Sequence, residues 1–186
     1  MIIPINNFLD KNSFLWLTDY ARNTDRWEPA NTPLWNNRCI NLSNIEVPEV
    51  IGALENLYAG IKDKIVQNLK PTGPIYPELL QIVRSPVADT NPPHSDSTGN
   101  NGEDNGTGFR VFSSILYLNR EFSGGELYFP NQKTTITPEP NLLVIFPATF
   151  EYMHGVQAIT DGMRYTVTSF WTYEQERDTT VGIFNV

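Results

Sequence analysis

Apolar residues recur at helical spacing in the first third of the chain. Within residues 47–70 they follow the pattern i, i+4, i+7, i+11, i+15 and i+19, which places them on one face of a helix. Pro48 stands at the start of this segment and Pro71 just past its end, where helices accept proline. Residues 4–22 show a looser helical pattern. The sequence therefore predicts two helices, separated by a loop rich in Pro, Asn and Trp (residues 25–37).

After residue 77 the pattern changes to short runs rich in β-branched and aromatic residues. Proline, glycine and asparagine separate the runs, as is typical of strands joined by turns. The runs span residues 78–85, 110–119, 125–130, 133–138, 141–147, 151–159 and 164–174. Helices followed by seven or eight such strands predict an α+β fold, mainly β, with the helices packed on one sheet. The expected core is a jelly roll, a double-stranded β-helix of the cupin-like kind.

The length of 186 residues fits one domain. We expect a single domain over residues 1–186, with residues 1–76 as mainly helical support and residues 77–175 as the jelly-roll core. The formal net charge of -8 disfavours nucleic acid and an anionic membrane surface as partners. The one cysteine, Cys39, allows no internal disulfide, and the first residues lack the features of a signal peptide. These observations predict a cytoplasmic protein.

Both histidines of the chain lie in its β-rich half. His94 belongs to the segment NPPHSDST (residues 91–98), two positions before Asp96. Residues i and i+2 of a strand point to the same side, so His94 and Asp96 can reach one metal ion. Two imidazoles and one carboxylate on one face of the metal form the ligand set of non-haem ferrous oxygenases. His154 is the one histidine left to complete this set.

Two other interpretations of these residues stay open, a structural role for the histidines and a zinc site. A catalytic zinc also accepts two histidines and a carboxylate, but the helical H-E-x-x-H arrangement is absent. Arg164, ten residues after His154, favours iron, because its planar guanidinium binds a carboxylate through paired hydrogen bonds. A ferrous enzyme that uses 2-oxoglutarate needs such a cation for the distal carboxylate of this cosubstrate.

The residues just described resemble the iron(II)/2-oxoglutarate oxygenases and, within them, the prolyl hydroxylases. The resemblance covers roughly residues 77–173. His-Ser-Asp, the second histidine and the arginine match the family's H-x-D…H…R/K pattern. RVFSSILYLNREFSGGELYFP (residues 110–130) is similar to the family's strand–YLN–turn–GGE–strand segment, which is the most specific stretch outside the ligands.

The resemblance implies a role for individual residues of the chain. His94, Asp96 and His154 would hold Fe(II). The C5 carboxylate of 2-oxoglutarate would be bound by Arg164, by the hydroxyl of Tyr117, and by the hydroxyl of Thr166 or Thr168, which share the face of Arg164 on an alternating strand. Ile115 and Leu127 would line the cosubstrate pocket and Val156 the metal side, with plain core packing as the alternative for these three.

Other positions bear on the substrate. An arginine at the position of Arg110, seven residues before Tyr117, lies near the substrate in prolyl hydroxylases, and a solvent-exposed charge at a strand end is the alternative. The chain departs from the family at Ser85 and around Asn91, where relatives often carry tyrosines, and these changes alter the expected pocket wall. Phe170 stands where the family usually has a tryptophan, which follows here one position later.

The expected activity is hydroxylation of an unactivated C–H bond, coupled to decarboxylation of 2-oxoglutarate to succinate and CO2. The substrate implied by the resemblance is a prolyl residue of a peptide or protein, with O2 as cosubstrate and ascorbate as reductant. A free amino acid or another small molecule is the first alternative, and a non-enzymatic jelly-roll binding module is the second. Residues 97–108 (STGNNGEDNGTG) predict a long surface loop, either a lid over the substrate or a solvated loop.

Overall fold

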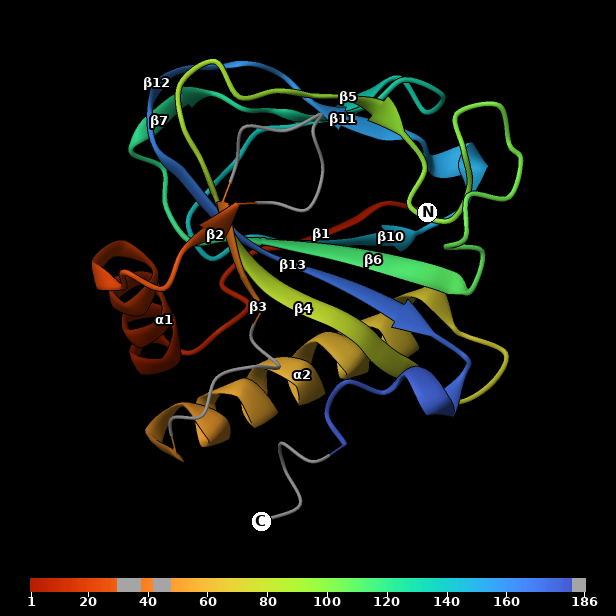
Figure 1. Cartoon of the computed structure of the whole chain (residues 1–186), viewed down its shortest axis with the longest axis horizontal. Coiled ribbons are helices and arrows are strands. Elements are labelled where there is room, and N and C mark those ends of the chain that lie inside the picture. Colours follow the sequence, from red (N-terminus) through yellow and green to blue (C-terminus); the bar gives the residue numbers. More distant parts are fainter. Residues whose placement is uncertain (30–37, 42–47, 182–186) are drawn as a thin grey trace.

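The computed structural model of the chain describes residues 1–29, 38–41 and 48–181. Its centre is a pair of facing β-sheets that form a jelly roll (Figure 1). The large sheet has the order β1 (Ile3–Ile5), β10 (Leu143–Pro147), β6 (Arg110–Tyr117), β13 (Arg164–Thr172), β4 (Tyr76–Ser85), β3 (Arg38–Asn41) and β2 (Glu28–Pro29). The small sheet has the order β5 (Asn91–His94), β11 (His154–Val156), β8 (Leu127–Phe129) and β9 (Thr134–Ile136). A two-stranded ribbon, β12 (Ile159–Gly162) with β7 (Phe122–Gly124), continues one end.

Two helices support the large sheet on its side away from the small sheet (Figure 1). Helix α1 (Lys11–Asn23) begins at Asp10, whose carboxylate accepts hydrogen bonds from the backbone N–H groups of Asn12 and Ser13. Helix α2 (Pro48–Leu69) lies across the sheet. Its buried residues are Leu54, Leu57, Tyr58, Ile61 and Ile65, as the helical spacing predicts. They form one core with the sheet residues that face them, among them Leu80, Ile82, Leu116, Val167 and Trp171.

A second, smaller core lies between the two sheets. It contains Ile115, Tyr117, Leu127, Phe129, Leu142, Val144 and Phe146. Alternation along each strand separates the two cores, since Leu116 of β6 faces the helices while its neighbours face the small sheet. Only part of the space between the sheets is filled by this core, and the remainder holds the candidate site.

The structure confirms the predicted fold class, the second helix and the later strands, and it corrects several local predictions. The first helix, predicted over residues 4–22, begins only at Lys11. The N-terminal third is not only helical, because β1, β2 and β3 join the large sheet. These strands are too short to give a clear alternation of apolar and polar residues. Strand β2 lies in the predicted loop 25–37, of which residues 30–37 lie outside the described part. The predicted strand 151–159 is interrupted, because a 3₁₀ turn (Phe150–Tyr152) precedes β11 and β12 begins only at Ile159.

Two bulges lie beside the C-terminal end of β13, one in each neighbouring strand. Towards β4 the pairing passes from Phe170–Leu79 to Trp171–Pro77 and omits Glu78. Towards β6 it passes from Trp171–Phe112 to Thr172–Arg110 and omits Val111. A bulge changes which face of the sheet the following side chains occupy. Strict alternation would place Arg110 opposite to Ser113 and Ile115, yet all three line the same cavity.

None of the helices in the described part of the chain is both long and apolar enough to cross a membrane.

Ile65 and Val66 are neighbours on α2 in opposite environments, since Ile65 is fully buried and Val66 is 47% exposed. We expect Ile65→Ala to lower the free energy of unfolding by about 2–5 kcal/mol, because it leaves a cavity between the helix and the sheet. The control, Val66→Ala, should change this free energy by about 0.5 kcal/mol or less. Urea unfolding followed by circular dichroism measures both, and equal losses would contradict the assigned packing of α2.

Candidate active site

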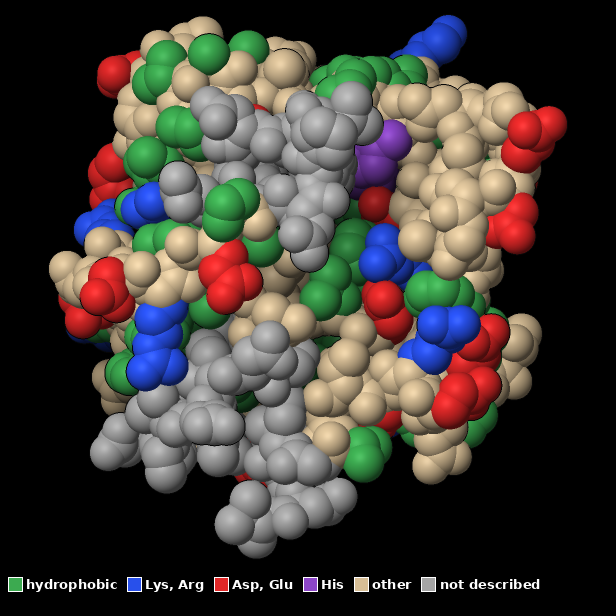
Figure 2. Space-filling model, viewed as in Figure 1, with side chains coloured by type: hydrophobic (Ala, Val, Ile, Leu, Met, Phe, Trp, Pro, Cys, Tyr) green, Lys and Arg blue, Asp and Glu red, His purple; other side chains and the backbone are tan. Residues whose placement is uncertain are grey.

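A cavity of about 590 Å³ opens between the two sheets. Its floor is formed by alternate residues of β4, β6 and β13, and its roof by β5 and β11. Short segments of β2 and β3 form one side, and the end of the loop 97–108 contributes Asn105 and Thr107. Histidine side chains are visible in a hollow of the surface between the layers (Figure 2). The volume lies within the range of about 300–1,000 Å³ that is usual for small-molecule sites.

The metal-ligand candidates meet in the roof of this cavity. Strands β5 and β11 pair antiparallel, with His94 directly opposite His154, and the centroids of the two rings are 4.5 Å apart. Asp96 follows β5, and its carboxylate lies beside both imidazole rings. Its Oδ1 is 3.5 Å from Nε2 of His94, and its Oδ2 is 3.6 Å from Nε2 of His154. One ligand atom from each residue lies within 4.8 Å of the other two.

Backbone carbonyl groups fix the orientation of both imidazoles. Nδ1 of His94 is 3.0 Å from the carbonyl oxygen of Pro92, and Nδ1 of His154 is 3.2 Å from that of Tyr152. A carbonyl only accepts hydrogen bonds, so a neutral ring carries its proton on Nδ1 and directs the Nε2 lone pair at the common centre. In most metal-bound histidines one ring nitrogen binds the metal and the other donates a hydrogen bond to a neighbouring acceptor, which is the arrangement seen here.

The ionisation of the three residues suits a cation. Burial raises the pKa of Asp96, but the nearby His154 and His94 and a hydrogen bond from Ser113 more than offset this and lower it to about 2. Burial lowers the pKa of His154, so its ring is neutral at pH 7. For His94, burial lowers the pKa but Asp96 and the Pro92 carbonyl outweigh it, giving a raised value. The cluster thus offers a fixed negative charge between two imidazoles.

Ser113 is a site residue that the sequence reasoning missed. Its Oγ donates a 2.6 Å hydrogen bond to Oδ2 of Asp96, and Ser113 is buried. A sequence signal existed, because Ser113 alternates with Ile115 and Tyr117 on β6, and all three therefore face the space between the sheets. Thr107 contacts the backbone of Asp96, since its Oγ1 donates a 2.8 Å hydrogen bond to the backbone oxygen of that residue.

Polar groups without partners mark the other end of the cavity. Arg164 is only 5% exposed, and its Nε has no hydrogen-bond partner among the described residues. The same holds for the hydroxyl of Tyr117, whose ring centroid lies 5.2 Å from Cζ of Arg164. Burial raises the pKa of Tyr117 despite the opposing charge of Arg164, so the hydroxyl keeps its proton and can donate. Thr166 and Thr168 line the cavity beside Arg164, as alternation predicts.

These groups match a carboxylate. An unpaired buried donor costs free energy, and a carboxylate would accept from the guanidinium and from the hydroxyl together. The cavity therefore offers a site for a divalent metal at the triad and a site for an anion at Arg164 of β13.

The structure also places the remaining predicted residues. Ile115, Val156 and Arg110 line the cavity, and so do the departing positions Ser85 and Asn91. Leu127 does not. It is fully buried and belongs to the core between the sheets together with Tyr117 and Phe129, so the expectation that it lines the cosubstrate pocket is corrected. Tyr117 does not line the cavity either, although its ring lies beside Arg164.

The two aromatic residues noted in the sequence lie on opposite faces of β13. Alternation from Arg164 through Thr166 and Thr168 brings Phe170 into the cavity and Trp171 into the helix-facing core. There Trp171 packs edge-on against Tyr58.

Comparison with solved structures shows the same fold. A viral collagen prolyl hydroxylase from Paramecium bursaria Chlorella virus-1 is 16% identical, with a TM-score of 0.72 over 91% of this chain and 94% of that chain. A prolyl-4-hydroxylase from Pseudomonas putida is 19% identical, with a TM-score of 0.69 over 93% of this chain and 92% of that chain. A prolyl hydroxylase from Trichoplax adhaerens, solved with a hypoxia inducible factor peptide, is 18% identical, with a TM-score of 0.70 over 95% and 85% of the two chains. At these identities the likeness establishes the fold.

Sequence comparison reaches the catalytic half of the chain. Prolyl 3-hydroxylase 1 of Gallus gallus is 37% identical over 71 residues, which are 36% of this chain and 10% of that protein. Prolyl 3-hydroxylase 3 of Homo sapiens is 38% identical over 73 residues, 37% of this chain and 10% of that protein. The matched part thus spans about a tenth of these relatives. The model of the 2OG-Fe(II) oxygenase superfamily matches residues 80–173, just over half of the chain and inclusive of the triad and Arg164, and the chain belongs to this superfamily.

Proposed function

We propose that the protein hydroxylates prolyl residues of a peptide or protein, using Fe(II), 2-oxoglutarate and O2. The observation that carries the proposal is a two-histidine, one-aspartate cluster in the same cavity as the buried Arg164, with Tyr117 beside that arginine. Among the described residues, Nε of Arg164 and the hydroxyl of Tyr117 have no hydrogen-bond partner. The non-enzymatic alternative would be favoured if a metal-ligand residue or the arginine were replaced. The chain has all four residues, His94, Asp96, His154 and Arg164.

In this proposal His94, Asp96 and His154 hold Fe(II) through two Nε2 atoms and one carboxylate oxygen. The donor set fits ferrous iron and leaves the face toward the cavity open for other ligands. Arg164 and Tyr117 bind the C5 carboxylate of 2-oxoglutarate, with Thr166 or Thr168 adding a hydroxyl. With iron bound, the reaction places one oxygen atom of O2 in succinate and the other in a substrate C–H bond, and releases CO2. The protein orients both substrates and excludes water.

The prolyl substrate rests on the family and on the relatives that the chain matches, whose names specify prolyl 3- and 4-hydroxylation. The cavity wall agrees in kind with a peptide, because it offers both apolar and polar groups, among them Phe170 and Arg110. Ascorbate is proposed as the reductant that restores Fe(II) after turnover without a substrate. A free amino acid remains the alternative substrate.

We infer that Ser113 positions Asp96. Its hydrogen bond occupies one lone pair of Oδ2 and holds the carboxylate in the plane between the two histidines. Outer-sphere partners of this kind are typically worth a factor of about 10–100 in metal affinity.

Ser113→Ala should therefore weaken Fe(II) binding by about 10–100-fold, measured by anaerobic titration with the metal. Ser114→Ala is the matched control. Ser114 is equally buried but bonds to Ser169 on the other face of β6, so its loss should lower stability and leave the iron affinity unchanged. A normal affinity in Ser113→Ala would show that the hydrogen bond is not needed to orient Asp96.

The cosubstrate site is tested by adding 2-oxoglutarate to the Fe(II) protein without oxygen and following the visible charge-transfer band of the chelate. We expect Arg164→Ala to require about 100-fold or more 2-oxoglutarate, because it removes a charged hydrogen-bonding partner in a buried site. His154→Ala should show no band. A folded wild-type protein without a band would contradict the whole assignment.

The substrate is tested with proline-rich peptides under air, scoring succinate and a mass gain of one oxygen on the peptide. Fragmentation and NMR then distinguish hydroxylation at C3 from hydroxylation at C4. Free L-proline serves as the competing probe, and hydroxylation of L-proline alone would favour the small-molecule alternative.

A further inference from the structure

Arg164 is the first residue of β13, at the point where the ladder between β13 and β6 ends. The outermost register pair of the two strands is Thr166 with Tyr117. One more backbone hydrogen bond follows, from the N–H of Leu118 to the carbonyl oxygen of Tyr165 at 3.0 Å. Strand ends fray, because their outer backbone groups have fewer neighbours. On its β6 side, the arginine thus stands where the backbone ladder alone would hold it least.

The side chain of Asn119 extends this ladder by one residue. Its Oδ1 accepts a 2.9 Å hydrogen bond from the N–H of Tyr165, and its Nδ2 donates a 2.7 Å hydrogen bond to the carbonyl oxygen of Met163. The side-chain amide therefore supplies the acceptor and the donor that a further peptide group of β6 would supply. The two bonds flank Arg164 along the chain. Asn119 is only 4% exposed, which shields both bonds from water.

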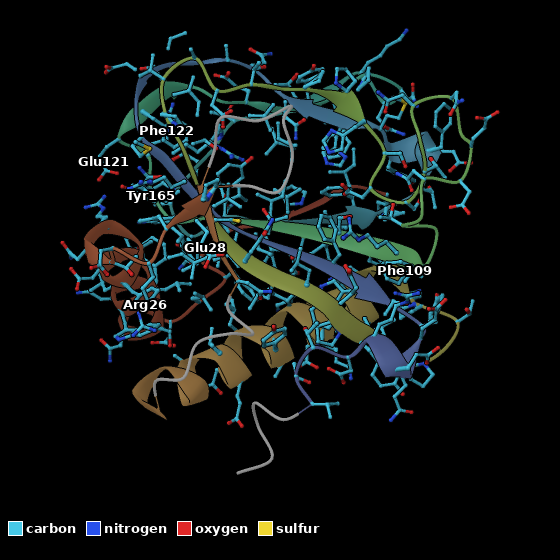
Figure 3. All side chains as sticks on the ribbon, viewed as in Figure 1. Arg26, Glu28, Phe109, Glu121, Phe122 and Tyr165 are labelled. Atoms are coloured by element: carbon cyan, nitrogen blue, oxygen red, sulfur yellow. The ribbon has the colours of Figure 1, made fainter. Side chains whose placement is uncertain are left out.

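The stem of Arg164 is confined by the segment that follows Asn119. Gly125 has a positive φ of 71°, and a Cβ there would lie 3.3 Å from Cδ of Arg164 and 3.0 Å from Cε2 of Phe122. Glycine is needed for the segment to approach the arginine this closely. The residues after β6 therefore surround the start of β13, and Figure 3 shows Phe122 and Tyr165 at the same edge of the molecule.

The position of Arg164 relative to the metal-ligand residues limits the length of an anion that spans the cavity. The metal ligands belong to the small sheet and to the turn after β5, whereas Arg164 belongs to the large sheet. A linear ligand that reaches from the metal site to the guanidinium must match the gap between them, and a longer ligand fits only if Arg164 moves. The two hydrogen bonds of Asn119 and the close approach of Gly125 oppose such movement.

We infer that Asn119 is a positioning residue that sets the chain length of the 2-oxo diacid bound by the site. By holding Arg164 in place, it favours 2-oxoglutarate over 2-oxoadipate, which is longer by one methylene. Asn119 is not among the described residues that line the cavity, so it acts through Arg164. This inference rests on the proposed function, in which Arg164 binds the distal carboxylate, and it specifies the cosubstrate selectivity of that site.

Anaerobic titration of the Fe(II) protein with each acid tests the inference, since both acids chelate iron through the same 2-oxo acid group and give a visible band. We expect the wild type to bind 2-oxoglutarate at least about tenfold more tightly than 2-oxoadipate, the usual effect of one methylene in a fitted site. Asn119→Ala should weaken binding of 2-oxoglutarate about tenfold, the order of effect of a lost hydrogen bond. Binding of 2-oxoadipate should stay nearly constant, so the preference falls to about threefold or less.

Hydrogen exchange of the metal-free protein gives a second measurement, which needs no ligand. The N–H of Tyr165 should exchange as slowly as the amides in the middle of β13, although it lies near the end of that strand. In Asn119→Ala it should exchange at least about tenfold faster, because its acceptor is gone. Fast exchange of this N–H in the wild type would contradict the assigned role of Asn119 even if the variant did not fold.

Asn141→Gly is the matched control. The side chain of Asn141 also bridges two backbone groups, since Oδ1 accepts from the N–H of Leu9 and Nδ2 donates to the carbonyl oxygen of Leu9, each at 2.8 Å. Its φ of 61° suits glycine, so the change removes the side chain without adding strain. This variant should lose stability and retain the preference for 2-oxoglutarate.

Asn119→Asp is the second test variant. It keeps the shape of the side chain and the acceptor for the N–H of Tyr165, but it cannot donate to Met163. The added negative charge weakens the binding of both acids alike, so the ratio of their affinities reports the position of Arg164. We expect this ratio to fall at least about threefold, in the same direction as in Asn119→Ala.

An unchanged ratio in folded Asn119→Ala or Asn119→Asp, an equal loss of the ratio in Asn141→Gly, or no preference for 2-oxoglutarate in the wild type would overturn the inference. Failure of the proposed function looks different. In that case neither acid gives a band with the wild type, whereas failure of the inference alone leaves the wild-type band with 2-oxoglutarate intact.

Discussion

The antiparallel pairing of β5 with β11 is the constraint on which the site depends. It sets His94 opposite His154, and the turn after β5 then carries Asp96 to both rings. Gly155 allows this approach, because a Cβ there would lie 2.7 Å from the backbone oxygen of Asn91 and 2.6 Å from the hydroxyl of Tyr128. A slip of one residue would turn one histidine to the other face of the sheet. The geometry of the triad is thus a property of strand register, and side-chain flexibility contributes little to it.

The two faces of the large sheet differ in how completely they are packed. The face toward α1 and α2 is closed and apolar, and it holds the main core of the protein. The face toward the small sheet is only partly filled and keeps two buried donors, Nε of Arg164 and the hydroxyl of Tyr117, without a hydrogen-bond partner among the described residues. Each such donor costs on the order of 1–3 kcal/mol until a ligand accepts from it. The closed face offsets this cost, so the active cavity does not have to contribute to stability.

Much of this arrangement could be predicted from the sequence. Alternation along β13 placed Thr166 and Thr168 beside Arg164, because it depends on the local geometry of one strand. The short i, i+2 spacing likewise placed Asp96 near His94, although Asp96 lies in the turn just after β5. Features that depend on how two strands pair could not be predicted. Residue parity puts Arg110 on the wrong face, and only the bulge at Val111 in the pairing of β6 with β13 corrects it. Leu127 was misplaced because a buried strand residue has the same sequence signature whether it meets a ligand or a core.

The loop 97–108 leaves the triad and returns to it. Its ends are fastened near the metal site, by the N–H of Ser97 on the carbonyl of Ala148 and by the hydroxyl of Thr107 on the carbonyl of Asp96. Between these points the side chains are mostly exposed, and the hydrogen bonds of Asn101, Asp104 and Asn105 stay within the loop. The span from Gly99 to Asp104 does not line the cavity, whereas Asn105 does and shares the hydroxyl of Thr107 with Asp96. This span offers a position where evolution or protein engineering can insert a recognition element at the rim of the cavity without displacing His94, Asp96 or His154.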